Sequence, residues 1–315
     1  WNLGVDYSFF EGRLYGKFDY YRREVDNLLF SVKVPQPPYT QGSQMQNIGS
    51  MESKGWEFEV GGDIIRTKDF TWSSSMNLSH NTGKILTLEG DNSYHNGNGF
   101  VAPGTPGDAA RMEAGSTIGS FYMWKFAGFD DEGSFLLYNK DGEVIPAAQK
   151  TENDKQYIGN YTPKLIIGWS HTLTYKNFDL GINLRSWIDF DVYNTINMYY
   201  GIQGQGNLNV LKDAYGKFNH IKGEKQICDY FLEDGTFLKI DAITLVYTLP
   251  MKKYTNNLID RIRIYGTVGN VCTITGYSGM NPEVDITGWD KGTEKFWSHE
   301  TITVMIGVVT LQRQD

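Results

Sequence analysis

Two glutamates, Glu57 and Glu59, are of the residue type that glycoside hydrolysis needs, because that reaction uses two carboxyl groups flanking the scissile bond. Their i, i+2 spacing within a stretch of alternating polar and apolar residues puts both side chains on one face of a β-strand. A strand that faces a water-filled lumen is polar along that face without any catalytic role. The pair therefore indicates a wet strand face, and we predict that this chain is not an enzyme.

Calcium binding is a second chemistry to consider, and it requires several oxygen ligands that converge on one cation. Asp130, Asp131 and Asp141 are the weak candidate ligands, with Asn139 and Gly142 in the same segment. The EF-hand spacing is absent, so ordinary polar turns are the favoured interpretation. The five histidines have no metal-ligand spacing, and we predict neither a metal nor another cofactor.

The two cysteines, Cys228 and Cys272, are too few for a metal cluster or a disulfide framework. Cys228 falls in a predicted long loop and Cys272 at the outer end of a predicted strand, both on the oxidising extracellular side. A disulfide between them and two free thiols are therefore both possible. The net charge of −8 argues against a nucleic-acid partner, since a phosphate-binding surface needs clustered Lys and Arg.

The composition bears on the fold class. Aromatic residues make up 14% of the chain, and 35 glycines stand against 9 prolines, a mixture that favours strands and tight turns. A transmembrane helix needs about 20 consecutive apolar residues, and every apolar stretch is interrupted sooner. The sequence therefore predicts an all-β protein without membrane helices.

Segments of about ten residues with alternating polarity dominate the chain, which is typical of strands with one face in lipid and the other in a polar lumen. In the clearest segment, 178–190, Leu180 and Ile182 alternate with Asp179 and Asn183. A slip by one residue would move the charges into hydrocarbon, so the pattern also determines the register. Nine strands are predicted, at 2–10, 13–21, 56–63, 70–78, 163–175, 178–190, 237–249, 261–272 and 301–311.

The connections between these strands are alternately short and long. Outer-membrane barrels have short periplasmic turns and long extracellular loops, so we expect the long connections outside. The aromatic segment 120–138 is then predicted to form a hairpin outside the membrane rather than two spanning strands. A soluble β-sandwich or β-propeller is the alternative, but such folds seldom carry long polar loops on one side only. The predicted long loops are 31–47, 81–162, 191–235 and 273–299.

Three segments, given at the end of this paragraph, resemble the SusC-like (SusC/RagA) family of TonB-dependent transporters and together cover much of the chain. In the segment that begins at Glu233, Thr236 and Lys239 stand where the family more often has Ser and Arg. The chain departs from the family at its end, 309–315, where relatives usually finish on an aromatic residue. The segments are Thr275–Val284 with Gly288-Trp289-Asp290, Glu233–Ile240 with Ala242–Pro250, and Tyr157–Lys164 with Gly168.

The resemblance implies the C-terminal part of a transmembrane antiparallel barrel of about 22 strands. It places a plug domain and a TonB-contacting segment before Trp1, in a protein of the outer membrane of a Gram-negative, Bacteroidetes-like bacterium. It also implies a SusD-like surface lipoprotein as partner and import of a nutrient oligomer, a glycan before a peptide. A non-transporting surface receptor or adhesin is the alternative function.

Aromatic residues in the predicted extracellular loops are the candidate substrate contacts, because sugar rings stack their C–H faces on Trp and Tyr. Each could instead pack within its own loop or against the lipoprotein. Tyr175 and Phe178 flank a short turn and are predicted to lie at the periplasmic interface. The candidate contacts are Tyr39, Tyr94, Phe100, Trp289 and Trp297.

Overall fold

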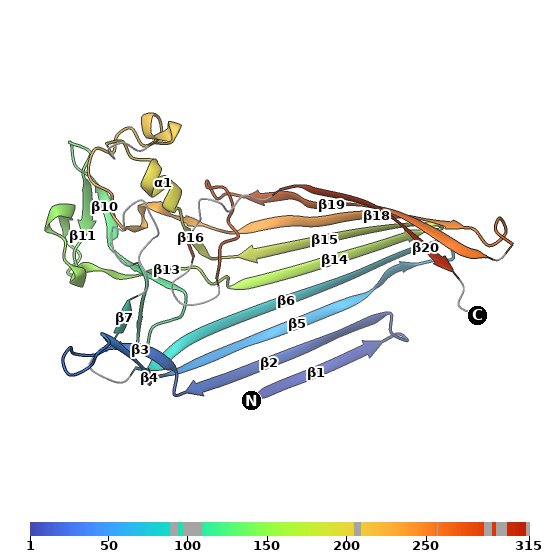
Figure 1. Cartoon of the computed structure of the whole chain (residues 1–315), viewed down its shortest axis with the longest axis horizontal. Helices are drawn as coiled ribbons and strands as arrows, with labels where there is room; N and C mark the ends of the chain where they lie inside the picture. The colour runs from blue at the N-terminus through green and yellow to red at the C-terminus, as the bar shows by residue number, and fades with distance from the viewer. Residues whose placement is uncertain are drawn as a thin grey trace.

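The computed structural model describes residues 1–88, 94–96, 109–204, 209–256, 258–286, 292–293 and 301–312. Its largest unit is one antiparallel sheet of nine long strands that lie side by side in sequence order, as Figure 1 shows. None of the helices in these ranges is long and apolar enough to cross a membrane. The strands are β1 (Asn2–Phe9), β2 (Leu14–Asp26), β5 (Ser50–Arg66), β6 (Phe70–Thr87), β14 (Leu165–Tyr175), β15 (Phe178–Ile188), β18 (Phe237–Pro250), β19 (Ile259–Thr275) and β20 (Thr303–Gln312).

The structure confirms the all-β class and a strand at each of the nine predicted places, but several strands are longer than predicted. β6 continues to Thr87 instead of ending at residue 78, and β5 begins at Ser50 instead of residue 56. The two strands stay paired along this extra length, up to the pair of Ser50 with Thr87. Alternating polarity marks a strand only where its two faces meet different media, so this extension carries no such signal.

The sheet has two chemically different faces. Residues that are directly opposed on neighbouring strands lie on the same face, so each face continues from strand to strand. We call them the apolar face and the polar face. One row of the apolar face contains Phe18, Phe58, Leu78 and Ile167. The neighbouring row of the polar face contains Lys17, Glu59, Asn77, Gly168, Arg185 and Lys239.

Aromatic side chains border the apolar face at both ends. Near the short turns, Tyr175 is paired with Phe178, and the Phe178 ring lies 4.6 Å from that of Tyr247. At the other end, Trp56 occupies the apolar face of β5. The strand between Trp56 and Ile65 rises roughly 30 Å, or about 23 Å along a membrane normal for a tilt of ~40°. This height matches the ~25 Å apolar band of outer-membrane barrels.

The assignment of the faces predicts a contrast between adjacent residues near the middle of β15. Ile182 lies on the apolar face and Asn183 is exposed on the polar face. An arginine at a lipid-facing midplane position costs about 2–4 kcal/mol, whereas a lumenal arginine stays in water. We therefore expect Ile182→Arg, but not Asn183→Arg, to lower the urea midpoint of the barrel in liposomes. Equal losses for the two variants would contradict the assignment.

The connections at one end of the sheet fold into a compact unit, seen beside the long strands in Figure 1. We call residues 109–164, 189–204 and 209–236 the loop module. It contains β8 (Arg111–Glu113), β9 (Ser120–Met123), β10 (Lys125–Phe129), β11 (Phe135–Tyr138), β12 (Val144–Pro146), β13 (Gln156–Asn160), β16 (Asp191–Tyr193), β17 (Leu232–Asp234), the helix α1 (Thr195–Tyr200) and the 3-10 helices η1 (Ala147–Gln149), η2 (Glu152–Asp154), η3 (Lys212–Tyr215) and η4 (Asp229–Phe231). Outside the module, β3 (Leu29–Lys33) pairs with β4 (Ser43–Asn47), and β7 (Tyr94–Asn96) pairs with β8.

The segment 120–138 only partly follows the prediction. β10 and β11 form the expected hairpin outside the long sheet, but β9 pairs with β13, which is more than thirty positions away. The reason is burial: Phe121 and Met123 are 2% and 0% exposed, and Tyr122 on the opposite face is also buried. A strand that is buried on both faces belongs in the centre of the module rather than at the edge of a hairpin.

Candidate functional site

Residues 276–286, which follow β19, fold back over the polar face of the sheet. We call them the inward segment. Its side chains Tyr277 and Val284 are 6% exposed and form a cluster with apolar residues at the loop end of the sheet. The other members of this cluster are Trp187 and Phe237 of the long sheet and Phe190 and Val192 of the loop module.

A group of charges fastens the inward segment to the wall, and we call Arg185, Lys239, Asp241 and Glu283 the charge cluster. Arg185 and Lys239 are direct neighbours on the polar face, so their like charges would repel without an anion between them. The Glu283 carboxylate accepts hydrogen bonds from Arg185 Nη2 at 3.1 Å and from Lys239 Nζ at 3.2 Å. Arg185 Nη2 also donates to Asp241 at 3.1 Å. Lys239 is 3% exposed, and a buried cation requires such partners.

A cleft of about 640 Å³ opens beside the charge cluster, between the wall and the inward segment. Its lining contains cationic hydrogen-bond donors and anionic hydrogen-bond acceptors. Such a lining can hold hydroxyl or amide groups, but it offers no arrangement of nucleophile and base. The residues that line the cleft are Arg185, Trp187, Lys239, Asn281, Glu283, Val284, Asp285 and Ile286.

A second set of contacts ties the inward segment to the loop module. The carboxylate of Glu233 accepts hydrogen bonds from the backbone N–H and the hydroxyl of Ser278, at 2.9 and 2.8 Å. It also accepts one from the side chain of Asn194 at 2.9 Å. Asn194 is fully buried and caps helix α1, since its side-chain oxygen accepts the N–H of Asn197 at 2.9 Å. One carboxylate thus joins the sheet end, the inward segment and the helix.

The third motif, at residues 157–164, meets the same junction. The backbone N–H of Asn160 donates to the Asp191 carboxylate at 2.8 Å, and burial raises the pKa of Asp191. Gly159 has a φ of +67°, and a Cβ there would lie 2.7 Å from both Asp191 and Leu232. The left-handed conformation therefore favours glycine at this position, and any side chain there would also have to displace the ends of the Asp191 and Leu232 side chains. The three segments that resemble the SusC-like family thus gather where the long sheet meets the loop module.

The structure describes only part of the predicted substrate contacts. Tyr39 is exposed in the turn between β3 and β4, and Tyr94 begins β7, where its backbone is paired with Glu113. Neither of them lines the cleft. The other candidates, Phe100, Trp289 and Trp297, lie outside the described residues.

The three aspartates considered as calcium ligands lie in two separate turns of the loop module. Asp130 and Asp131 lie in the turn between β10 and β11, whereas Asp141 lies in the next turn, at the opposite end of β11. The Asp130 carboxylate accepts the N–H of Ser134 at 2.7 Å, which is an ordinary turn contact. In the described ranges, no three His, Cys, Asp or Glu side chains are grouped so that they could hold a metal ion.

Glu57 and Glu59 lie on the polar face, where β2 places Asp19 and Lys17 opposite them. The residues of the charge cluster were not predicted as site residues. The sequence does carry one signal for them. Arg185 and Lys239 are charged residues at polar-face positions, close to the apolar loop ends of their strands.

The structure separates the two cysteines. Cys228 is fully buried in the loop module, and Cys272 is exposed on the apolar face opposite Ile240, so both are free thiols. Burial raises the pKa of Cys228 to about 12, which leaves it protonated at pH 8, and the thiol form is a poor nucleophile.

We therefore expect N-ethylmaleimide, an uncharged reagent that can enter the detergent around the apolar face, to label Cys272 and not Cys228 at pH 8 in the detergent-solubilised folded protein. Peptide mass mapping measures this. Addition of guanidinium chloride should make both thiols react, because unfolding removes the burial that protects Cys228. Equal labelling of the two cysteines before denaturation would show that the loop module is not packed as described.

Comparison with known proteins gives a consistent result. The sequence matches the family described as "TonB dependent receptor-like, beta-barrel" over residues 1–208. TonB-dependent receptor P3 of Formosa agariphila is 29% identical over 307 residues, covering 90% of this chain and 30% of the relative. TonB-dependent receptor SusC of Bacteroides thetaiotaomicron is 31% identical over 300 residues, covering 90% and 29%. The structure of the RagAB peptide transporter superposes with a TM-score of 0.78 at 25% identity, covering 98% of this chain and 34% of that chain.

The chain thus spans 29–30% of the length of these two relatives. The family match extends over more than half of the chain, and it agrees with the register and the two faces of the sheet. Receptors of this family lie in the outer membrane, which puts the apolar face against lipid and the polar face toward the lumen. The chain therefore belongs to the TonB-dependent receptor-like β-barrel family of the outer membrane, and among the members of that family it is similar to SusC and to RagAB.

Proposed function

We propose that the full-length protein imports a nutrient oligomer across the outer membrane in a TonB-dependent manner, together with a SusD-like surface lipoprotein. The observation that carries the proposal is the cleft on the lumenal wall, held open at the loop end of the barrel by the inward segment. Its position suits a substrate that has entered between the loops and is about to move down the lumen. The named relatives support the same activity, since RagAB is described as a peptide transporter.

The lining of the lumenal wall supports an uncharged, hydroxyl-rich oligomer as substrate. From the row of Arg185 toward the short turns, the polar face of β6 carries Asn77, Ser75 and Ser73, and that of β14 carries Ser170 and Thr172. Such groups exchange hydrogen bonds with sugar hydroxyls without holding any one strongly, because neutral hydrogen bonds contribute only about 1 kcal/mol each. We therefore propose a glycan before a peptide. Tyr39, Tyr94, Phe100, Trp289 and Trp297 remain proposed contacts on the loop side.

A growth and uptake experiment in the native host tests the proposal. The gene for the full-length protein is deleted and restored, and uptake of fluorescent oligosaccharides and oligopeptides is measured with and without functional TonB. We expect oligosaccharide uptake to require both the gene and TonB. Uptake of peptides alone would reverse the substrate assignment. Surface binding without any TonB-dependent uptake would replace the transporter by the alternative, a surface receptor or adhesin.

A further inference from the structure

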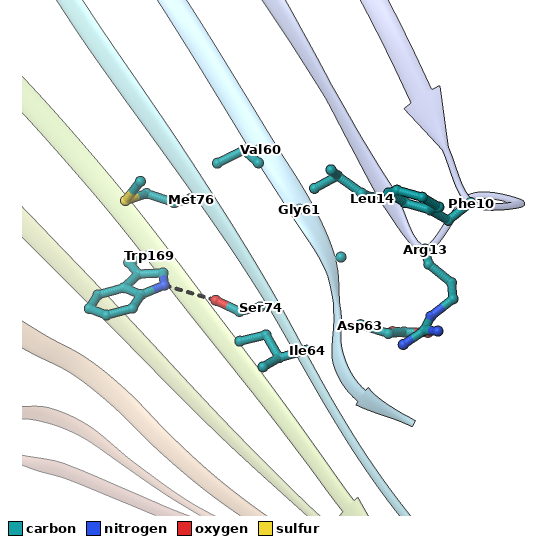
Figure 2. A pocket seen from close by; sticks show the side chains of 11 residues that line it. Phe10, Arg13, Leu14, Val60, Gly61, Asp63, Ile64, Ser74, Met76 and Trp169 are labelled. Atoms are coloured by element: carbon teal, nitrogen blue, oxygen red, sulfur yellow. Dashed lines mark hydrogen bonds between the residues drawn. The ribbon is translucent and has the colours of Figure 1, made fainter. Parts of the chain in front are cut away.

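A groove of about 600 Å³ lies on the apolar face, near the short turns of the sheet, and Figure 2 shows it from close by. It runs across β2, β5, β6 and β14. Since the short turns are periplasmic in this family, the groove faces the periplasmic leaflet of the outer membrane. Its lining residues are Phe10, Arg13, Leu14, Val60, Gly61, Gly62, Asp63, Ile64, Ser74, Met76 and Trp169.

The groove exists because small residues interrupt the apolar face at one level of the sheet. Gly62 and Ser74 are direct neighbours there, between the larger side chains of Val60 and Met76 on one side and the β-bulge after Asp63 on the other. The Trp169 indole forms a wall, and its Nε1–H donates to Ser74 Oγ at 2.9 Å, as seen in Figure 2. The indole N–H of the wall is therefore satisfied within the groove, and most of the remaining lining, including Val60, Ile64 and Met76, is apolar.

A cation stands at the edge of this groove. Arg13 belongs to the turn between β1 and β2, and its guanidinium has no hydrogen bond or ion pair within the described ranges of the chain. The nearest carboxylate in the lining, Asp63, already accepts from Ser73 at 2.7 Å and is 3.4 Å from Arg66. Arg13 is thus a free anion-binding group beside an apolar groove, at the level where lipid phosphates lie.

We propose that this groove binds one phospholipid of the periplasmic leaflet, with an acyl chain over Gly62 and Ser74 and the phosphate on Arg13. The occupant must be amphiphilic, because the floor around Val60, Gly62 and Met76 favours an apolar group whereas Arg13 at the edge attracts an anion. The bilayer around the apolar face has two leaflets, but only lipids of the periplasmic leaflet reach the turn that carries Arg13. The proposal is independent of the transported substrate.

Native mass spectrometry of the full-length receptor tests this binding, after gentle extraction from lipid nanodiscs that contain phosphatidylglycerol. We expect the natural protein to retain one phospholipid. Met76→Trp and Ser74→Leu fill the groove and should abolish its retention. Arg13→Ala should weaken it about fivefold, the effect of one basic residue at an anionic membrane surface, whereas Arg13→Lys should largely keep it.

Two matched controls make the result specific. Leu245→Trp adds the same bulk to the apolar face outside the groove, and Lys176→Ala removes a cation from another short turn. Both controls should retain the lipid as the natural protein does. Heat-modifiable gel mobility shows that each variant is folded before it is measured. Equal retention in all folded variants, or equal loss in the controls, would overturn the proposal and indicate bulk lipid only.

Discussion

Replacing Glu283 with alanine should release the inward segment from the barrel wall. The substitution removes the carboxylate that lies between Arg185 and Lys239, whose side chain is 4% exposed, and leaves Asp241 at 4.0 Å from Lys239 Nζ. Removing one partner of a buried ion pair costs about 3–5 kcal/mol, and we expect the lower end because the Glu283 side chain is 20% exposed. Hydrogen–deuterium exchange of residues 276–286 should rise sharply, since their closed state rests on this cluster.

The exposed pair of Arg22 with Glu24 provides a control for this experiment. The Glu24 side chain is 51% exposed, and Arg22 keeps a second partner in Glu52 at 2.6 Å. Glu24→Ala should therefore cost less than ~1 kcal/mol and leave the exchange of 276–286 unchanged. If Glu283→Ala left that exchange unchanged too, the aromatic cluster around Tyr277 alone would hold the segment. Uptake measured in the same strains shows whether releasing the segment impairs transport.

Phe121→Ala should unfold the loop module while leaving the barrel strands intact. Phe121 is 2% exposed at the centre of the module core, with its ring 5.7 Å from that of Tyr161 and 6.3 Å from that of Tyr193. Truncation of a buried phenylalanine to alanine costs about 3–5 kcal/mol through lost burial and the cavity that remains. We expect the module to lose its packing locally, because the long strands of the sheet are hydrogen-bonded to one another and not to strands of the module.

Limited proteolysis with gel mobility distinguishes the two parts. We expect new cleavage between residues 109 and 236 in Phe121→Ala, with heat-modifiable migration of the barrel retained. Tyr215→Ala is the control, since Tyr215 belongs to the same module but is 70% exposed and should tolerate truncation. Cleavage unchanged from the natural protein would mean that other contacts carry the stability of the module. Loss of heat-modifiability would mean that the barrel requires the module.

Sequence reasoning located the long strands because their signal is local. A strand between lipid and a lumen must alternate with period two, and a one-residue slip would bury charges such as Asp179 in hydrocarbon. The pattern therefore specifies both the strand and its register from its own residues. It was lost where β5 and β6 extend past the membrane, because there the medium is the same on both faces.

The candidate site could be predicted only in part, because its contacts join residues far apart in sequence. The motifs at 157–164, 233–250 and 275–284 indicated important segments, but not that Glu233 binds Ser278 or that Glu283 binds Lys239. A carboxylate acquires a role only from the cations that folding brings to it, and local patterns do not contain that information. The same applies to the expected hairpin, which burial of Phe121 divided between two pairings.

The amino-acid sequence by itself thus determined the all-β class, the two faces of the sheet and the separation of short turns from long loops. Each of these follows from the alternation of neighbouring residues between two solvents. Only the tertiary structure decided that the long loops form a packed module, that the inward segment is fastened to Arg185, and that Gly62 and Ser74 leave a groove on the apolar face. These features depend on shape and charge contributed by several strands at once, and no single stretch of the chain specifies them.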